Sequence, residues 1–323
     1  MNDKKTVPST LPPEIRLKTA YEFAFSPDSK RGAYIGGRYV TILDIARYKS
    51  LFAVHPIANP SYIDFSPDGR VLVVKGTSGR TIILDAKTGR LRCDFRNQKE
   101  GEGDRALFTR CSRFVVSISW NGLFSVRDCK STEIVFSQSY SNCQLTELSA
   151  TADRSLFVYS VGGEPRSPDG LTPCTVALHR WPTRRMTAEK LPREWEAIWG
   201  LQVSPSGRFL ALVHGTPPNT LEVFDIARSR TVARCRWNGS PGCSIAWSSD
   251  EKMIVTNADN CFRMHALPGL RVVRELPAQY PCFVQFSPSG EYLALGSWKH
   301  SFIIPTDSLA DFGGGRSCVI SRS

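Results

Sequence analysis

Short apolar runs recur along the chain and are separated by tight turns of the type Ser-Pro-Asp-Gly. One example is the run 62–65, which is followed by the turn 66–69 and by a second apolar run at 71–74. β-Branched and aromatic residues dominate the runs, while proline and glycine favour the corners of turns, so the pattern predicts antiparallel strands. No long stretch shows the periodicity of an amphipathic helix.

The turns recur seven times at a spacing close to 40 residues. We place their first residues at 26, 66, 109, 150, 204, 248 and 287, which gives intervals of 40, 43, 41, 54, 44 and 39. Each turn lies between two apolar runs, and a loop, a third run, a second turn and a more polar fourth run follow. Such a unit is a four-stranded meander whose two faces need covering by neighbours. The sequence therefore predicts an all-β fold, a seven-bladed β-propeller of four-stranded antiparallel blades.

The repeated unit resembles the WD40-repeat family over about residues 20–306. The resemblance rests on phrases such as Phe65-Ser66-Pro67-Asp68-Gly69-Arg70 and on third runs that end in aspartate, at Asp44, Asp85, Asp128 and Asp225. The family's Trp-Asp dipeptide is replaced here, for example by Leu84-Asp85, and its Gly-His dipeptide is missing. We therefore expect a divergent member, whose blades are stabilised by apolar packing between sheets.

Three segments are expected along the chain. Residues 21–306 form the propeller, and residues 1–20 form an N-terminal extension in which apolar and charged residues alternate at 14–18. The resemblance implies that this extension supplies a latch, the outer strand of the last blade. Residues 307–323 contain three consecutive glycines and few apolar residues, which predicts a disordered tail. The one long interval places an insertion, 162–173, between the second and third strands of the fourth blade.

The loops between second and third strands share a face with the blade-to-blade connections in this topology. By resemblance, this face is the docking surface of the propeller. Tryptophan, tyrosine and arginine are the residue types that most often anchor protein interfaces. Candidates at loop positions are Arg38, Arg80, Trp120, Trp195, Tyr280 and Trp298. Each could instead pack between blades. The sequence predicts a non-catalytic scaffold or adaptor that binds a peptide segment or domain within a multi-protein complex.

The chain carries a formal net charge of +11, and part of the excess is clustered. We expect a basic patch on the third-to-fourth-strand turns and outer strands of blades four to six, with Arg180, Arg184, Arg185, Arg228, Arg230, Arg234 and Arg236 as its residues. A basic patch attracts acidic partners, and the alternative function is an RNA-associated subunit of a ribonucleoprotein or translation-type assembly. Solvated charge that protects outer strands from aggregation explains the same residues without any partner.

Sequence signals for catalysis are few. The five histidines are far apart, and neither a Gly-x-Ser-x-Gly elbow nor a phosphate-binding loop occurs. The inner strands offer mainly Glu22, Asp64 and Glu147 to the central channel, so an enzyme with a channel site is a second alternative. We predict no enzymatic activity, no cofactor and no metal.

Cysteine usage and hydropathy bear on the compartment. Ten cysteines without a Cys-x-x-Cys motif indicate reduced thiols, and no apolar stretch reaches the length of a membrane span. We expect an intracellular, cytoplasmic protein, with the nucleus left open.

Overall fold

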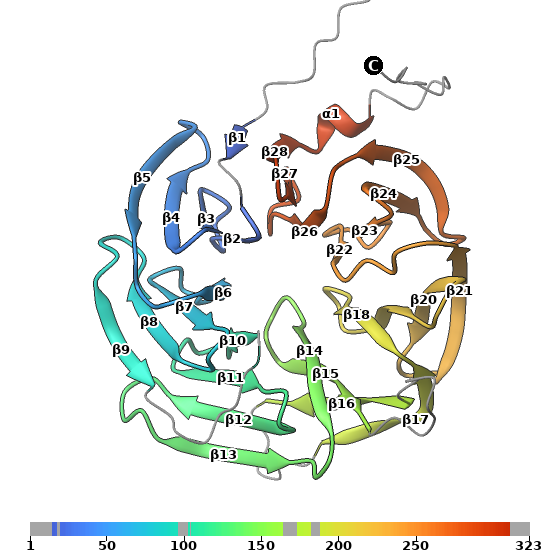
Figure 1. Cartoon of the computed structure of the whole chain (residues 1–323), viewed down its shortest axis with the longest axis horizontal. Coiled ribbons are helices and arrows are strands. Elements are labelled where there is room, and N and C mark those ends of the chain that lie inside the picture. The colour runs from blue at the N-terminus through green and yellow to red at the C-terminus, as the bar shows by residue number, and fades with distance from the viewer. Residues whose placement is uncertain are drawn as a thin grey trace, which may run out of the picture.

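The protein is a closed ring of seven four-stranded antiparallel sheets (Figure 1). The computed structural model describes residues 15–17, 20–95, 103, 105–163, 173–181 and 188–310. Each sheet is one blade, and in all but the last blade the four strands pair in chain order from the centre outwards. The prediction of a seven-bladed propeller from the repeat is therefore confirmed.

The first four blades contain the following strands. Blade one consists of β2 (Glu22–Phe25), β3 (Arg31–Gly36), β4 (Tyr39–Asp44) and β5 (Lys49–Val54). Blade two consists of β6 (Pro60–Phe65), β7 (Val71–Gly76), β8 (Thr81–Asp85) and β9 (Leu91–Phe95). Blade three consists of β10 (Ala106–Phe108), β11 (Phe114–Ile118), β12 (Leu123–Asp128) and β13 (Ile134–Ser139). Blade four consists of β14 (Gln144–Ala150), β15 (Leu156–Gly162), β16 (Pro173–Arg180) and β17 (Glu189–Glu196).

The last three blades complete the ring. Blade five consists of β18 (Ile198–Val203), β19 (Phe209–His214), β20 (Asn219–Asp225) and β21 (Arg230–Trp237). Blade six consists of β22 (Ile245–Trp247), β23 (Met253–Ala258), β24 (Cys261–Ala266) and β25 (Arg271–Pro277). Blade seven consists of β26 (Pro281–Phe286), β27 (Tyr292–Ser297), β28 (Ser301–Pro305) and the N-terminal strand β1 (Ile15–Leu17).

The ring is closed by a strand from the other end of the chain. β1 pairs antiparallel with β28, with Ile15 opposite Ile303, so the strand expected from residues 14–18 is present as the outer strand of the last blade. Phe23 of blade one stacks on Phe283 of blade seven with ring centroids 5.9 Å apart. The backbone N–H of Ser289 donates to the hydroxyl of Ser29 at 2.9 Å. Strand pairing, ring packing and a hydrogen bond therefore all join the first and last blades.

The C-terminal segment differs from the expected tail at its beginning. Residues Asp307–Ala310 form a short helix, α1, in which Asp307 lies in the first turn. Leu309 packs against the apolar cluster between blades six and seven, which accounts for order in this segment. The rest of the predicted tail, 311–323, lies outside the described residues, as do the central residues of the insertion, 164–172, between β15 and β16.

The hydrophobic core is divided among the seven interfaces between neighbouring blades. Each of the seven apolar clusters joins two adjacent blades, for example Ile42 of blade one with Ile82 of blade two. A single four-stranded sheet leaves two apolar faces exposed, and in a ring each face is covered by the next blade. The closure strand therefore also completes the core, since Ile15 lies in the cluster between blades seven and one.

One hydrogen-bond pattern explains the repeated turn. In all seven copies the first turn residue donates its backbone N–H to the carbonyl five residues later, as Ser66 does to Val71 at 2.9 Å. The hydroxyl of Ser66 also donates to Asp68 at 2.6 Å. The fourth turn residue has a positive φ in every copy, which favours glycine at Gly69, Gly207 and Gly290. A hydroxyl residue at the first position and a positive φ at the fourth are therefore shared by all seven turns.

The fourth turn begins one residue later than the repeat indicated. Its N–H to carbonyl bond runs from Thr151 to Leu156 at 3.0 Å, and the Thr151 hydroxyl donates to Asp153 at 2.7 Å. The starting position 150 was therefore wrong, and the neighbouring intervals are 151 − 109 = 42 and 204 − 151 = 53. Ala150 stands where other copies have a large apolar residue before the turn, so the sequence carries no marker of the register there.

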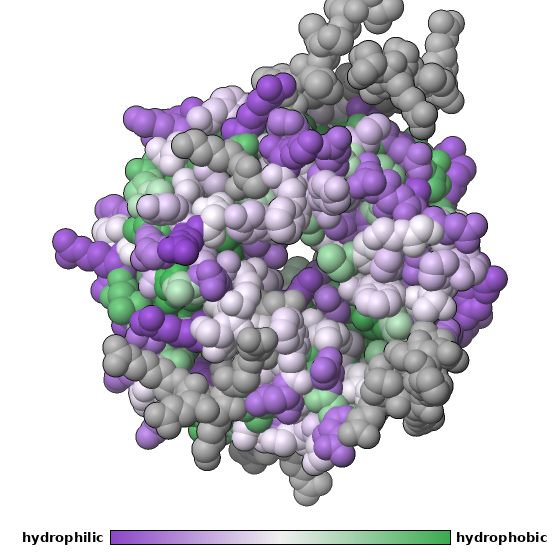
Figure 2. Space-filling model, viewed as in Figure 1, coloured by the Kyte–Doolittle hydropathy of each residue, from purple (hydrophilic) through white to green (hydrophobic). Residues whose placement is uncertain are grey.

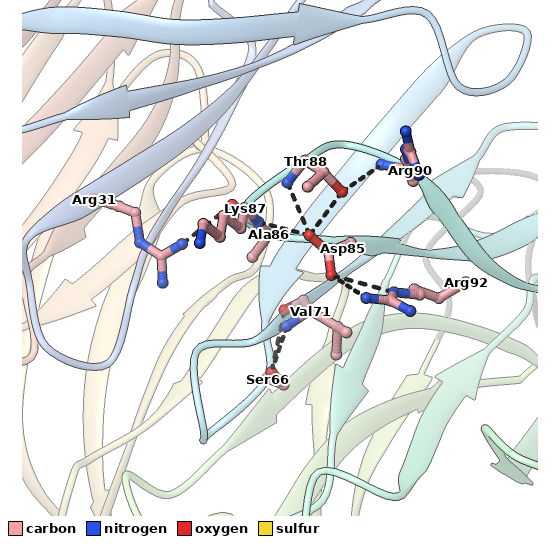
Figure 3. A network of polar contacts seen from close by, with 9 residues as sticks. All are labelled: Arg31, Ser66, Val71, Asp85, Ala86, Lys87, Thr88, Arg90 and Arg92. Atoms are coloured by element: carbon pink, nitrogen blue, oxygen red, sulfur yellow. Dashed lines mark hydrogen bonds and ion pairs between the residues drawn. The ribbon is translucent and has the colours of Figure 1, made fainter.

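The aspartates that end the third strands stabilise the third-to-fourth-strand turns. Asp85 accepts hydrogen bonds from the N–H and the hydroxyl of Thr88, each at 2.8 Å, and from the Arg92 side chain at 2.6 Å (Figure 3). Hydrogen bonds from Arg92 and Thr88 lower the pKa of Asp85. Arg31 of blade one donates to the carbonyl of Ala86 in the same turn at 3.1 Å. The repeated aspartate therefore stabilises a turn, and in blade two that turn also bonds to the neighbouring blade.

The two faces of the ring carry different connections. We call "loop face" the side formed by the blade-to-blade connections and the loops between second and third strands. These lie together, as the N–H of Trp298 bonded to the carbonyl of Tyr280 at 3.1 Å shows. We call "turn face" the opposite side, where first-to-second-strand turns lie beside third-to-fourth-strand turns, as in the bond from Ala86 N–H to the carbonyl of Arg70 at 2.9 Å.

Candidate interaction face

The exposed tryptophans of this chain lie on the loop face. Of seven tryptophans, three are exposed, namely Trp120, Trp199 and Trp298. Trp120 lies in the loop between β11 and β12, and Trp298 in the loop between β27 and β28. Trp199 lies near the start of β18, where its indole N–H donates to the carbonyl of Gly215 in another loop of that face at 2.7 Å. The large exposed indoles are therefore all displayed on one side of the ring.

The loop face carries its most exposed aromatic side chains at blade seven, on the connection from blade six and on the loop between β27 and β28. Tyr280 is 67% exposed and Trp298 is 64% exposed, and their loops are joined by the backbone hydrogen bond described above. The ring of Tyr21 lies 5.9 Å from that of Trp298, and its hydroxyl accepts the N–H of Gly37 at 2.7 Å. Tyr21 therefore connects the two blades across the surface.

Two exposed cations border these aromatic residues. Arg38 follows Gly37 in the loop between β3 and β4, and Lys299 follows Trp298. Tyr39, 55% exposed, begins β4 and lies 5.8 Å from the ring of His55. We call these residues the blade 7–1 patch: Tyr21, Arg38, Tyr39, Tyr280, Trp298 and Lys299.

The structure places the predicted loop residues in four different environments. Arg38, Tyr280 and Trp298 are exposed on loops of the blade 7–1 patch, whereas Trp120 is exposed on blade three, on the same face but in a different blade. Arg80 is exposed beside β8, and its guanidinium forms an ion pair with Asp94 at 2.7 Å. The charge of Arg80 is therefore already matched within blade two.

The placement of Trp195 on an exposed loop was wrong. Trp195 lies on β17, is 3% exposed and packs against Phe224 of blade five with ring centroids 5.5 Å apart. Alternate side chains of β17 point inwards, and Leu191 is buried in the same way. The strand continues to Glu196 and leaves a single residue before β18, so Trp195 belongs to the core between blades four and five.

Sequence reasoning missed Trp199. The pairing of β18 with β19 shifts register between Ile198 and Gly200, and this irregularity turns the intervening indole outwards. Gly200 is the available signal, because a side chain there would come within 2.9 Å of the Cys243 carbonyl. Gly200, next to Trp199 at the start of β18, was therefore the sequence signal for the irregular pairing of β18 with β19.

The inner strands surround a central channel (Figures 1 and 2). It forms a cavity of about 620 Å³, lined among others by Glu22, Asp64 and Glu147, as the sequence indicated. Asp64 forms an ion pair with Arg154 at 2.9 Å that reaches from blade two to blade four. Glu147 forms an ion pair with Arg105 at 3.1 Å. Two of the three acidic side chains are therefore paired with arginines across blades.

Desolvation shifts the pKa values of several ionisable side chains that line the channel. Burial raises the pKa of Asp64, although Arg154 opposes the shift, and burial also raises the pKa of Tyr62. Two thiols line the same channel, where desolvation by the surrounding side chains raises the pKa of Cys243 and raises that of Cys282 to about 12. Both thiols are protonated at neutral pH, so neither has the thiolate character of an activated nucleophile.

The predicted basic patch is partly neutralised. Arg228 lies 3.5 Å from Asp225, and Arg234 lies 3.4 Å from buried Glu222. Arg180, Arg230 and Arg236 are exposed on or beside the outer part of blades four and five, while Arg184 and Arg185 lie outside the described residues. The expected approach of Arg184 and Arg185 to blade five therefore stays a prediction.

Within the described ranges, no three histidine, cysteine, aspartate or glutamate side chains are grouped so that they could hold a metal ion, and no helix is long and apolar enough to cross a membrane. No protein-family model matches this chain, and no curated protein is similar to it. The propeller fold therefore stands on the structure, and the relation to WD40 repeats stays a resemblance.

Proposed function

We propose that this protein is a non-catalytic scaffold or adaptor that holds a protein partner on its loop face within a multi-protein complex. The observation that carries the proposal is the set of exposed aromatic side chains on that face, above all Tyr280 and Trp298. Aromatic side chains bury a large area on binding and lose little conformational entropy, so they are frequent anchors of protein interfaces. Their display on one side of a rigid ring is what a docking surface requires.

The rigidity of the supporting loops favours binding. The loop of Trp298 is closed by the Ser297 hydroxyl, which donates to the carbonyl of His300 at 2.8 Å and accepts its N–H at 3.0 Å. Tyr21 packs beside Trp298, as described above. Anchors that are already held in position cost less entropy on binding than anchors on free loops. The resemblance to WD40 repeats, whose docking surface is this face, supports the same conclusion.

The two alternative functions have less support. The RNA alternative depends on unmatched basic charge, yet Arg228 and Arg234 both lie within ion-pair distance of carboxylates. The enzyme alternative depends on the acidic residues of the channel, and Asp64 and Glu147 have structural partners in Arg154 and Arg105. A non-catalytic function and a cytoplasmic location stay predictions.

Partner recovery with paired variants tests the proposal. The double variant Tyr280→Ala, Trp298→Ala removes the two most exposed anchors, and Tyr48→Ala removes a 51% exposed tyrosine from the turn face as the matched control. We expect proteins that copurify with the wild-type chain and with Tyr48→Ala to be lost, by about tenfold or more, with the double variant. Equal thermal stability of the three proteins confirms that the loss is not due to unfolding.

The opposite result contradicts the proposal. If the double variant retains its partners while Tyr48→Ala or a variant of the outer strands loses them, the docking surface is not the loop face. Loss of every partner on charge reversal of Arg230 and Arg236, together with a shift of labelled RNA by the wild-type chain, would favour the RNA alternative.

A further inference from the structure

The blade 7–1 patch combines aromatic and basic side chains without a carboxylate among them. Arg38 and Lys299 are exposed, and neither forms an ion pair with another described residue, whereas Arg80 on the same face is paired with Asp94. An exposed cation beside aromatic rings offers both charge attraction and apolar contact to a ligand. The patch is therefore chemically distinct from the rest of the loop face that the structure describes.

The patch is continuous from blade seven to blade one. Tyr280 and Trp298 are joined by a backbone hydrogen bond, Trp298 lies beside Tyr21, and Tyr21 accepts the N–H of Gly37, which precedes Arg38. The two cations thus lie in the two loops that Tyr21 connects. Blade seven and blade one therefore each contribute one exposed cation to loops that Tyr21 connects.

We propose that the blade 7–1 patch binds an acidic peptide segment of the protein partner, with an apolar or aromatic side chain of that segment packed on Trp298 and Tyr280. This inference rests on the proposed function and specifies the partner's chemistry. Carboxylates of the segment pair with Arg38 and Lys299, and the net charge of +11 attracts an acidic segment over a longer range.

The number of cations favours a peptide over a nucleic acid. Binding of single strands relies on a basic groove that follows several phosphates, with bases stacked along it. The patch provides two cations beside its aromatic rings, enough for one short acidic segment. A single-stranded nucleic acid is therefore an outcome of the test and not the proposal.

Selection from a random-peptide display library on the full-length chain provides the test. We expect the selected peptides to be enriched in Asp and Glu and to contain at least one aromatic or aliphatic residue. Their affinity should fall by about tenfold or more in the double variant Arg38→Glu, Lys299→Glu, and should also fall as salt rises. The control Lys49→Glu, Lys87→Glu changes the net charge equally at exposed positions on or near the turn face and should leave the affinity within about twofold.

Four results would overturn this inference. Selected peptides that need Trp298 but show no acidic enrichment would leave docking on the loop face intact and refute its charge specificity. Peptides that bind the Arg38→Glu, Lys299→Glu variant as well as the control would place the site elsewhere, and an empty selection would count against peptide binding altogether. A labelled oligouridine probe that binds the wild-type chain but not this variant would reassign the patch to nucleic acid.

Discussion

At the scale of single residues, buried charged side chains hold neighbouring blades together. Glu222 of β20 is fully buried and accepts hydrogen bonds from Arg193 of blade four at 2.6 and 3.2 Å. Thr231 also donates to Glu222, and the ring nitrogen Nε2 of His214 lies 3.0 Å from it. A buried carboxylate is tolerated when it is paired and hydrogen-bonded in this way. The network joins the outer strand of one blade to the middle of the next.

The ionisation of Glu222 leads to a pH-dependent prediction. Burial alone would raise its pKa, but the hydrogen bonds and the charge of Arg193 outweigh burial and lower the pKa to about 2. A carboxyl whose folded pKa is lowered stabilises the fold above its unfolded pKa, near 4.5, and this contribution is lost as pH falls towards 2. We expect Glu222→Gln to lower the free energy of unfolding at pH 7 by about 2–3 kcal/mol.

Denaturant unfolding at pH 7, 4 and 3 measures this effect. The stability difference between wild type and Glu222→Gln should shrink as the pH falls through 4. The exposed Glu189→Gln variant, on the outer strand β17, serves as control. A stability difference that is the same at all three pH values would mean that the charge of Glu222 contributes nothing.

How much of the candidate site could be predicted depends on the local sequence around each residue. Arg38, Tyr280 and Trp298 lie next to Gly37, Pro281 and Ser297, so their loop positions could be predicted from the repeat. Trp195 could not be placed, because the end of a strand before a one-residue connection leaves no turn signal. Trp199 was missed because its exposure comes from an irregular strand pairing. The contact of Tyr21 with Trp298 joins opposite ends of the chain, and no local pattern encodes it.

At the scale of elements, the seven hydroxyl turns set the register of the first two strands in each blade. Ser66 is buried, donates to Asp68 at 2.6 Å and accepts the N–H of Val71 at 3.1 Å. We expect Ser66→Ala to lower the free energy of unfolding by about 1 kcal/mol, because the variant loses the hydrogen bonds that the buried hydroxyl forms with Asp68 and with the N–H of Val71. Chemical denaturation measures the loss, and Ser78→Ala, at an exposed loop position in the same blade, is the control. Equal stability of the two variants would show that the turn hydroxyl is dispensable.

The closure strand is the second element whose contribution can be measured. Deletion of residues 1–20 removes β1 and buried Ile15, so β28 loses its partner and the core between blades seven and one loses apolar contacts. We expect a loss of about 2–5 kcal/mol in the free energy of unfolding and a lower Tm, observed by circular dichroism. Deletion of residues 1–10 keeps β1 and is the matched control. An unchanged Tm in the longer deletion would exclude a latch role for this strand.

The period of the repeat made the element order predictable. Six of the seven turn positions could be located from the sequence because a hydroxyl residue, a bend and an apolar strand recur together, and the seventh was displaced by one residue at Ala150. The helix at 307–310 was not foreseen, since four residues next to a glycine run show no helical periodicity, and its order comes from packing of Leu309 on the ring. The local sequence thus encodes the turns, whereas contacts between segments far apart in the chain determine the structure near its two termini.

At the scale of the whole molecule, the two faces of the ring differ in their side chains. The turn face and the channel contain matched hydrogen bonds and ion pairs, such as Asp85 with Arg92 and Asp64 with Arg154. The loop face displays exposed aromatic residues, and at the blade 7–1 patch it adds two cations without ion-pair partners among the described residues. The proposed docking surface therefore lies on loops that the closed ring supports, which is the arrangement that the proposed scaffold function needs.

Hydrogen–deuterium exchange of the full-length chain, with and without a partner recovered by copurification, tests docking on the loop face most directly. We expect the partner to slow exchange in the loop segments 36–39, 278–281 and 297–300, and to leave the turn segments 26–31 and 86–90 unchanged. Protection of the turn segments or of the outer strands β21 and β25, with no change in these loops, would contradict docking on the loop face.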